Sequence, residues 1–262
     1  MKAASTVTKV CRIIGEFAER KSLGVTDLAK RTELLPSDVH RILASLKASG
    51  YIVQDSQTKK YQLGLPLMRV GLAACQRNEL HEKAHRVLVR LSEQIKATTH
   101  FGIFDDRELQ VYLIDDVTVS AEDRFRNQLG GPARLHCTAL GKAILANLDP
   151  RKAAYAIEKS GMARSTGHTI TDRSVLEKQL QMVRNQGFAV DYDECLEGAS
   201  CLGCPVRDSE GELVGAISTS MPTQQFLTWD EYHLAEHLKT AALGITRSLS
   251  LLGSAGGFHA MM

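Results

Sequence analysis

A nucleophile and a base stand side by side in the stretch "RLHCTALGKAIL", residues 134–145, where His136, Cys137 and Thr138 precede a helical pattern. Covalent catalysis would need the imidazole aligned on the thiol and a third group to orient it. Neighbouring side chains on an extended segment point in different directions, which argues against a catalytic dyad. Two hypotheses remain open from these residues alone: a small-molecule hydrolase with a Cys/His pair, or a pocket that only holds a ligand.

The start of this helix has a chemistry of its own. The first backbone N–H groups, near Thr138–Leu140, have no partners inside the helix. They carry the positive end of the helix dipole and suit a carboxylate. The sequence therefore predicts an anion site at Thr138 and Ala139.

A pair of hydroxyl groups lies in the stretch "AISTSM". Ser218 and Ser220 are two residues apart and share one face of a strand, whereas Ile217 and Thr219 share the other. Buried hydroxyls are unfavourable unless a partner satisfies them. That partner is either a polar ligand or neighbouring backbone, and the sequence does not decide between the two.

A CxxC motif, Cys201 to Cys204, suggests redox activity or half of a zinc site. Pro205 and Val206 indicate an extended segment, in which residues three apart point to opposite faces. No second CxxC follows. We therefore expect no metal and no cofactor, and we interpret the six scattered cysteines as reduced thiols.

The elements that position these groups alternate along the chain after residue 77. A helix is expected over "HEKAHRVLVRLSEQIKAT", and further helices over residues 138–147, 150–160, 172–186 and 228–252. Strand patterns occupy "THFGIFDD", "ELQVYLIDDV", "GFAVDYDE", "SCLGCPVRD" and "LVGAISTSM". This order predicts an α+β sensor-like domain with a mixed sheet and helices to one side. The tail, residues 253–262, is expected to be disordered.

The length and composition of the chain fit two domains of a globular protein. The 262 residues are 44% hydrophobic and 24% charged. No apolar run approaches the roughly 20 residues that span a bilayer, and residues 1–17 lack the apolar stretch of a signal peptide. We expect a cytoplasmic protein with no membrane partner.

The net charge of +2 hides an asymmetry between the two ends of the chain. Residues 1–76 carry 12 Lys and Arg against 6 Asp and Glu, and residues 77–262 carry 20 against 24. A basic head on a mildly acidic body is typical of a polyanion-binding domain joined to a second domain.

The basic head has the element order of a winged helix-turn-helix. Apolar spacing predicts a helix over residues 8–20, a short helix over 26–31 capped by Thr26, and a third helix that begins at Pro36 and ends at Gly50. Two β-prone runs around a basic turn then indicate a hairpin. In such a domain the third helix enters the major groove, and the hairpin contacts phosphates.

We expect the DNA contacts to come from polar residues of the second and third helices and from the hairpin. Asp38 fits this set less well, because phosphates repel a carboxylate. It either accepts a hydrogen bond from a cytosine amino group or lies just off the contact surface. The alternative is a head that docks protein, for which binding would show little salt dependence. The candidate residues are Thr26, Ser37, Asp38, His40, Arg41, Ser45, Lys47, Lys59 and Lys60.

Three stretches together resemble the IclR-type transcriptional regulators. They are "SDVHRILASLKASGYIVQD" with "KYQLG", "LGGPARLHCTALGKAILA" and "GFAVDYDECLEGASCLGCPVRDSEGELVGAISTS". The resemblance covers residues 5–250. It implies a winged helix-turn-helix at 1–64, a linker helix at 65–76 and a GAF/PAS-like α+β effector-binding domain at 77–252.

The resemblance also implies operator DNA as a partner, a homodimer or dimer of dimers, and a small organic acid as effector. The effector positions that it implies are Thr138, Ala139, Asp191, Cys201, Ser218 and Ser220. Asp38 departs from the small polar residue usual there, which puts base reading at this position in doubt. Arg207 replaces an aromatic residue or histidine and is expected at the end of a strand. The resulting hypothesis is a regulator that senses a small hydroxy or keto acid and controls a catabolic operon, and the sequence does not decide between a repressor and an activator.

Overall fold

A computed structural model describes residues 5–119 and 129–250 of the chain. The chain divides into two compact units, residues 1–78 and 79–262, which we describe separately. The predicted disordered tail lies outside the described residues. No helix among residues 5–119 and 129–250 combines the length and apolar character that crossing a membrane requires.

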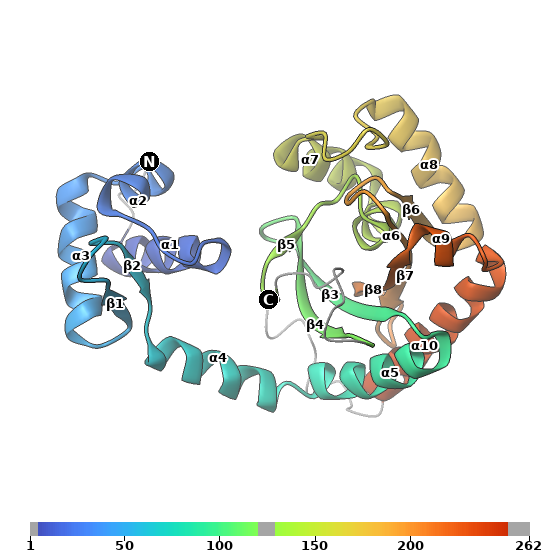
Figure 1. The fold of residues 1–262 in the computed structure, drawn as a ribbon, viewed down its shortest axis with the longest axis horizontal. Coiled ribbons are helices and arrows are strands. Elements are labelled where there is room, and N and C mark those ends of the chain that lie inside the picture. The colour runs from blue at the N-terminus through green and yellow to red at the C-terminus, as the bar shows by residue number, and fades with distance from the viewer. Residues whose placement is uncertain (1–4, 120–128, 251–262) are drawn as a thin grey trace. The chain divides into compact units, whose positions relative to one another are not determined.

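The first unit contains four helices and a two-stranded hairpin in the order that the sequence predicts (Figure 1). The antiparallel hairpin pairs Ile52 with Leu63. The elements are α1 (Thr6–Glu19), α2 (Val25–Thr32), α3 (Pro36–Ala48), β1 (Ile52–Gln54), β2 (Tyr61–Leu63) and α4 (Leu65–Arg77).

A single apolar core holds α1, α2, α3 and the hairpin together. Ile13 of α1, Leu28 of α2 and Leu43 of α3 are fully buried in it. Ile52 and Tyr61 bring the hairpin into the same cluster. Burial of each such side chain contributes about 1.5–3 kcal/mol, so the hairpin is fixed against the three helices.

The predicted cap of α2 is wrong. Thr26 is an exposed residue inside the helix, and the N-cap is Gly24. The carboxylate of Asp27 accepts a hydrogen bond from the Gly24 N–H at 3.4 Å. An acidic side chain in the first turn therefore satisfies the helix start in place of the threonine hydroxyl.

The second unit is built on one six-stranded sheet with strand order β5-β4-β3-β8-β7-β6. Every pairing in it is antiparallel. The strands are β3 (Thr98–Asp105), β4 (Gln110–Val117), β5 (Pro132–Ala133), β6 (Ala189–Tyr192), β7 (Ala199–Arg207) and β8 (Leu213–Pro222). The helices are α5 (Glu79–Ile95), α6 (Ala139–Asn147), α7 (Pro150–Ser160), α8 (Arg173–Gln186), α9 (Thr223–Phe226) and α10 (Glu231–Ser250).

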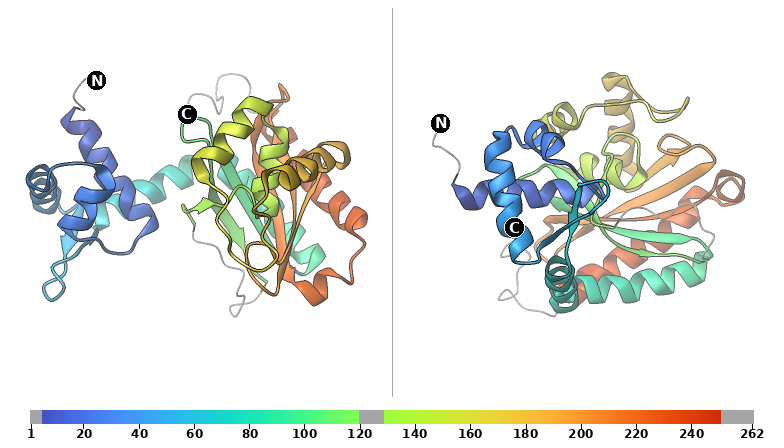
Figure 2. Two further views of the ribbon diagram at one scale, coloured as in Figure 1. Left: turned by 90° about the horizontal axis from the view of Figure 1, so that it is seen from above. Right: turned by 60° about the vertical axis from the view of Figure 1, so that its left-hand side comes forward.

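Helices cover both faces of this sheet. The predicted mixed sheet with helices to one side is therefore wrong in two respects, the strand directions and the placement of the helices. One face packs against α5 and α10 through residues such as Phe101 and Ile217. The other packs against α6, α7 and α8 through residues such as Leu113 and Ala216. Figures 1 and 2 show α5 and α10 on the opposite side of the strands from α6, α7 and α8. We call the latter side the α6 face.

Three local features of the second unit differ from the prediction. Pro132 and Ala133 form the short edge strand β5 rather than a loop. Residues 223–226 form a separate helix, α9. The last helix starts at Glu231, because the Asp230 carboxylate accepts the His233 N–H at 2.8 Å and ends the preceding turn.

Candidate DNA interface and effector site

The outward side of α3 carries most of the predicted DNA contacts. Ser37, His40, Arg41 and Ser45 are exposed, while Val39, Ile42 and Leu43 turn into the core. Pro36 occupies the first turn of α3, as the sequence predicts. A helix with one buried and one free polar face is the geometry that a major groove accepts.

Asp38 does not face outward in the same way. Its carboxylate accepts from the Lys9 ammonium of α1 at 2.6 Å and from the Arg41 guanidinium at 3.4 Å. The hydrogen bond and charge of Lys9 lower the pKa of Asp38 below its usual value. The carboxylate thus joins α3 to α1 and holds two cations beside it.

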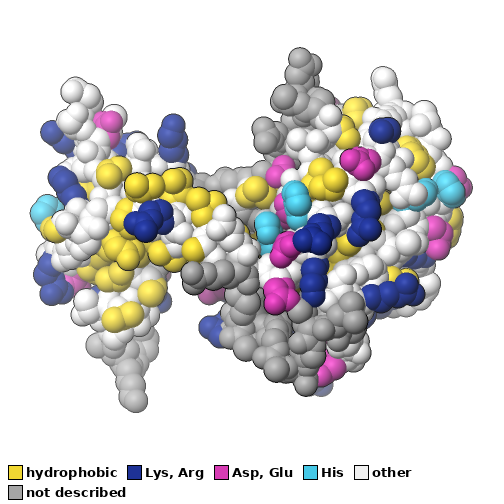
Figure 3. Space-filling view, turned by 90° about the horizontal axis from the view of Figure 1, so that it is seen from below, with side chains coloured by type: hydrophobic (Ala, Val, Ile, Leu, Met, Phe, Trp, Pro, Cys, Tyr) yellow, Lys and Arg dark blue, Asp and Glu magenta, His cyan; other side chains and the backbone are white. Residues whose placement is uncertain are grey.

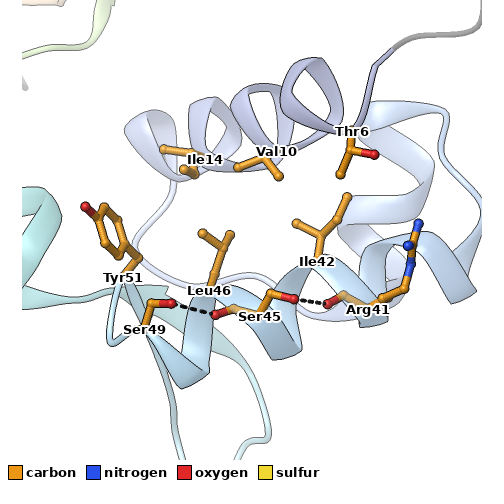
Figure 4. A pocket seen from close by; sticks show the side chains of 9 residues that line it. All are labelled: Thr6, Val10, Ile14, Arg41, Ile42, Ser45, Leu46, Ser49 and Tyr51. Carbon is orange, nitrogen blue, oxygen red and sulfur yellow. Dashed lines mark hydrogen bonds between the residues drawn. The ribbon is translucent and has the colours of Figure 1, made fainter.

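A groove lies between α1 and α3 (Figure 4). Val10 and Ile14 line it from α1, and Ile42 and Leu46 from α3. Arg41 and Ser45 also line it, and the Ser45 hydroxyl donates to the Arg41 carbonyl at 3.1 Å. The Ser45 hydroxyl is therefore partly committed to its own helix.

The hairpin is tied to α3 by a short relay of hydrogen bonds. The Lys47 ammonium donates to the Gln54 side chain at 2.9 Å, and the Gln54 amide donates to the Lys59 carbonyl at 3.0 Å. Asp55 orders the turn by accepting from the backbone and hydroxyl of Thr58 at 2.6 and 2.8 Å. Lys59, at φ 58°, and Lys60 are exposed.

In the second unit, four polar side chains form a continuous row across the α6 face. Asp191 of β6 pairs with Cys201 of β7, which pairs with Ser220 of β8. The Cys201 Sγ lies 3.0 Å from the Ser220 Oγ, and the Ser220 Oγ lies 3.1 Å from Nε2 of His100 on β3. We call Asp191, Cys201, Ser220 and His100 the polar row; three were predicted site residues, and His100 was not.

The start of α6 lies directly over the neighbouring strand positions. A Cβ on Gly203 of β7 would come within 2.7 Å of the Ala139 carbonyl oxygen and 3.0 Å of the Leu140 nitrogen. Gly203 pairs with Ser218, and Ser218 with His100. Because side chains two residues apart share a face, the helix start, Ser218 and the polar row lie on one side of the sheet.

The free donors at this helix start are main-chain groups rather than the Thr138 hydroxyl. That hydroxyl accepts from the Gly141 N–H at 2.9 Å and donates to the Arg134 carbonyl at 2.6 Å. Within the described part of the chain, the N–H groups of Ala139 and Leu140 have no hydrogen-bond acceptor. The pairing preference of buried N–H groups makes them candidates for an anion.

Burial changes the protonation of the polar row. It raises the pKa of Asp191 to about 7, against the opposing charge of Lys142, and raises the pKa of the Cys201 thiol well above its usual value. Asp191 is thus neutral in a large fraction of molecules near pH 7 and does not simply repel an acid. Burial also lowers the pKa of His100 to about 4.

A buried ion pair beside the row was not predicted. The Lys142 ammonium of α6 lies 2.5 Å from the Glu194 Oε1 and also donates to the Gln179 side chain at 3.0 Å. Burial raises the pKa of Glu194, and Lys142 opposes that rise. The one sequence signal was a lysine within the otherwise apolar stretch "ALGKAILA".

The adjacent His136 and Cys137 do not act together. His136 Nε2 lies 3.1 Å from the Ala163 carbonyl, and the Cys137 thiol hydrogen-bonds with Cys195, which lowers the pKa of Cys137. Cys201 belongs to the α6 face and Cys204 to the core beneath α10, so the CxxC thiols diverge as predicted. No group of three or more His, Cys, Asp or Glu among the described residues could hold a metal ion.

A winged helix-turn-helix joined to an α+β domain with a row of buried polar side chains is typical of one class of protein, the ligand-responsive DNA-binding regulators. Two family models match the chain, the IclR helix-turn-helix domain at residues 6–56 and the bacterial transcriptional regulator IclR C-terminal at residues 72–247.

Individual relatives agree with this. The chain is 33% identical to HTH-type transcriptional regulator KdgR of Escherichia coli (strain K12), over 94% of this chain and 93% of that one. The Thermotoga maritima IclR structure superposes with a TM-score of 0.68 at 26% identity, over 93% and 98% of the two chains. An IclR homologue from Microbacterium hydrocarbonoxydans, complexed with 4-hydroxybenzoate, has a TM-score of 0.76 at 22% identity, over 94% and 100%.

The chain belongs to the IclR family of bacterial transcriptional regulators. It is a DNA-binding regulator with a ligand-binding C-terminal domain, and its relatives are regulators rather than enzymes.

Proposed function

We propose that this chain is a cytoplasmic repressor of a catabolic operon whose operator affinity is controlled by a small hydroxy or keto acid. The observation that supports an acid as effector is a pair of N–H groups, at Ala139 and Leu140, for which the described residues offer no acceptor. They lie over Gly203, next to Ser218. The effector carboxylate accepts from these donors and from Ser218. Cys201 forms a small wall of the effector site.

The second polar group of the effector lies against the polar row. At the Asp191 end of the row, a pKa of about 7 lets the side chain accept from a hydroxyl when ionised and donate to a carbonyl oxygen when protonated. Both hydroxy and keto acids therefore fit. The ligand in the complex of the Microbacterium homologue, 4-hydroxybenzoate, is an acid that carries a hydroxyl group.

DNA binding rests on α3 and the hairpin. Ser37, His40 and Arg41 face the major groove, and Lys47, Lys59 and Lys60 neutralise phosphates. Thr26 at the start of α2 contacts the DNA backbone, and Asp38 pairs with Lys9 and Arg41 rather than with DNA.

Dimerisation follows from the apolar stripe of α4. Leu65, Met68 and Leu72 lie at helical spacing and are 61%, 57% and 55% exposed. Figure 3 shows hydrophobic side chains gathered on this side of the first unit. A second copy of α4 would cover the stripe, giving a homodimer or a dimer of dimers, and α4 would transmit the effector's preference to the DNA-binding units.

A gel-shift titration with DNA from upstream of the gene tests the proposal at about 50 and 200 mM salt, with and without candidate acids. We expect an affinity that falls steeply with salt, by roughly 10³-fold or more, and release of the DNA by at least one acid. Salt-independent binding that no acid changes would overturn the proposal.

A further inference from the structure

One end of the polar row holds a buried polar atom that no described residue satisfies. His100 is 1% exposed, and its Nε2 hydrogen-bonds with Ser220 at 3.1 Å. Its other ring nitrogen, Nδ1, is buried and has no hydrogen-bond partner among the residues that the structure describes. Buried polar atoms are almost always paired, which makes this nitrogen a candidate for contact with a bound ligand.

The imidazole is neutral, because burial holds the pKa of His100 near 4. A neutral ring carries one donor and one acceptor nitrogen. The Cys201 thiol stays protonated and hydrogen-bonds with Asp191. When Asp191 is ionised the thiol donates to it, Ser220 can donate to Cys201, and His100 Nε2 donates to Ser220, which leaves Nδ1 as a bare acceptor.

Protonation of Asp191 can reverse this chain and turn Nδ1 into a donor. A carbonyl oxygen satisfies only the donor form of the ring nitrogen. A hydroxyl group satisfies both forms, because it donates and accepts. The chemistry of the row therefore selects a hydroxyl at His100.

The register sets how far this hydroxyl lies from the carboxylate. The free N–H groups lie over Gly203 on β7, and His100 lies on β3, two strands away across β8. Two strand spacings are about 10 Å. A hydroxyl several bonds from the carboxylate spans this separation more readily than one on the adjacent carbon.

We propose that His100 is an effector-binding residue whose Nδ1 selects acids with a distal hydroxyl, several bonds from the carboxylate. This inference rests on the proposed acid-sensing function. It assigns a specificity-determining contact beyond the predicted site residues.

Two matched substitutions separate the two ring nitrogens. In His100→Gln the side-chain amide can replace Nε2 and keep the contact with Ser220, but nothing stands at Nδ1. In His100→Asn the amide can replace Nδ1 and loses the Ser220 contact. Both remove the ring, so a merely structural role of His100 would affect both variants alike.

The measurement is calorimetric titration of the full chain with paired acids. The pairs are 4-hydroxybutyrate and butyrate, 6-hydroxyhexanoate and hexanoate, and 4-hydroxybenzoate and benzoate, with lactate and propionate as the control for a proximal hydroxyl. We expect the wild type to prefer the hydroxylated member of at least one distal pair by about tenfold. His100→Gln reduces this ratio to near one, and His100→Asn retains most of it.

Each of the following outcomes would overturn the proposal. If His100→Gln leaves the ratio of affinities for the hydroxylated and plain acids unchanged, or if both variants lose the preference equally, the Nδ1 contact is rejected. Acid sensing is unaffected by either result. Failure of every acid to bind the wild type or release its DNA removes the proposed function as well. If either variant is unfolded by circular dichroism, the ¹⁵N resonance of Nδ1 in ¹⁵N-histidine-labelled wild type decides: it moves on adding the hydroxylated acid and stays on adding its partner, whereas an equal response to both rejects the contact.

Discussion

The ammonium nitrogen of Lys142 lies 2.5 Å from Oε1 of Glu194, and the two side chains are only 1% and 5% exposed. Lys142 is on α6, and Glu194 follows β6. The same segment is held from the other side, since the Thr169 hydroxyl donates to the Glu194 carbonyl at 2.6 Å. The pair therefore fixes the start of α6 relative to Asp191, whose carboxylate accepts the Glu194 N–H at 2.7 Å.

Lys142→Met is expected to destabilise the second unit by about 3–5 kcal/mol, because it leaves the Glu194 carboxylate buried without its cation. Urea unfolding followed by Trp229 measures this, since Trp229 is the chain's one tryptophan and lies in the second unit. The double variant Lys142→Met/Glu194→Leu should recover much of the loss. A double variant no better than the single one would contradict a dominant role for the unpaired charge.

Asp191→Asn is expected to gain stability relative to the wild type as pH rises. The folded pKa of about 7 lies above the ordinary 3.8, so the folded state binds the proton more tightly and the wild type loses stability between about pH 4 and 7. Asparagine has no such loss. The free energy of unfolding of the variant minus that of the wild type should therefore increase by up to about 4 kcal/mol from pH 4 to 8. An unchanged difference in urea titrations would contradict the raised pKa; Asp172→Asn serves as an exposed control.

His100→Gln is expected to show the opposite pH trend. The folded pKa of His100, about 4, lies below the ordinary 6.5. Between these two pH values the imidazole is protonated in the unfolded chain but neutral in the folded state. Wild-type stability is lost as pH falls from about 6.5 to 4, and the variant escapes this loss by up to about 3 kcal/mol. His168→Gln, at an exposed position, is the control substitution. A wild type and His100→Gln with parallel pH profiles would show that the imidazole titrates normally.

Lys59→Ala and Lys60→Ala are expected to weaken operator binding uniformly across DNA sequences. Each should reduce the slope of log affinity against log salt by about 1, since each removes one phosphate contact. Lys159→Ala is the matched control, because Lys159 pairs with Glu108 in the second unit at 3.3 Å. Anisotropy titrations at several salt concentrations measure the slopes. Equal slopes for all variants would remove the hairpin from the DNA interface.

Asp38→Ala is expected to strengthen DNA binding while leaving base preference unchanged. The substitution releases Lys9 and Arg41, which the carboxylate holds at 2.6 and 3.4 Å, and it removes a negative charge near the phosphates. Competition with operators altered one base pair at a time measures the preference. A change confined to a single base position would show instead that Asp38 reads a base.

The sequence by itself determined most of the elements and their order, with the short β5 and α9 as exceptions. The apolar spacing of α3, with Val39, Ile42 and Leu43 inward, follows from the 3.6-residue repeat. The alternation of Ser218 and Ser220 follows from the two-residue repeat of a strand, and the divergence of Cys201 from Cys204 follows from the same rule. These are local properties, so no knowledge of distant contacts was needed.

Only the tertiary structure decided what each polar group contacts. His100 is 120 residues from Ser220, and Lys142 is 52 residues from Glu194; such pairs depend on strand order and on which helices cover which face. The same holds for Asp38, whose partner Lys9 comes from another helix. Local periodicity fixes which way a side chain points, but the free energy of a buried charge or hydrogen bond depends on partners that only the folded chain brings together.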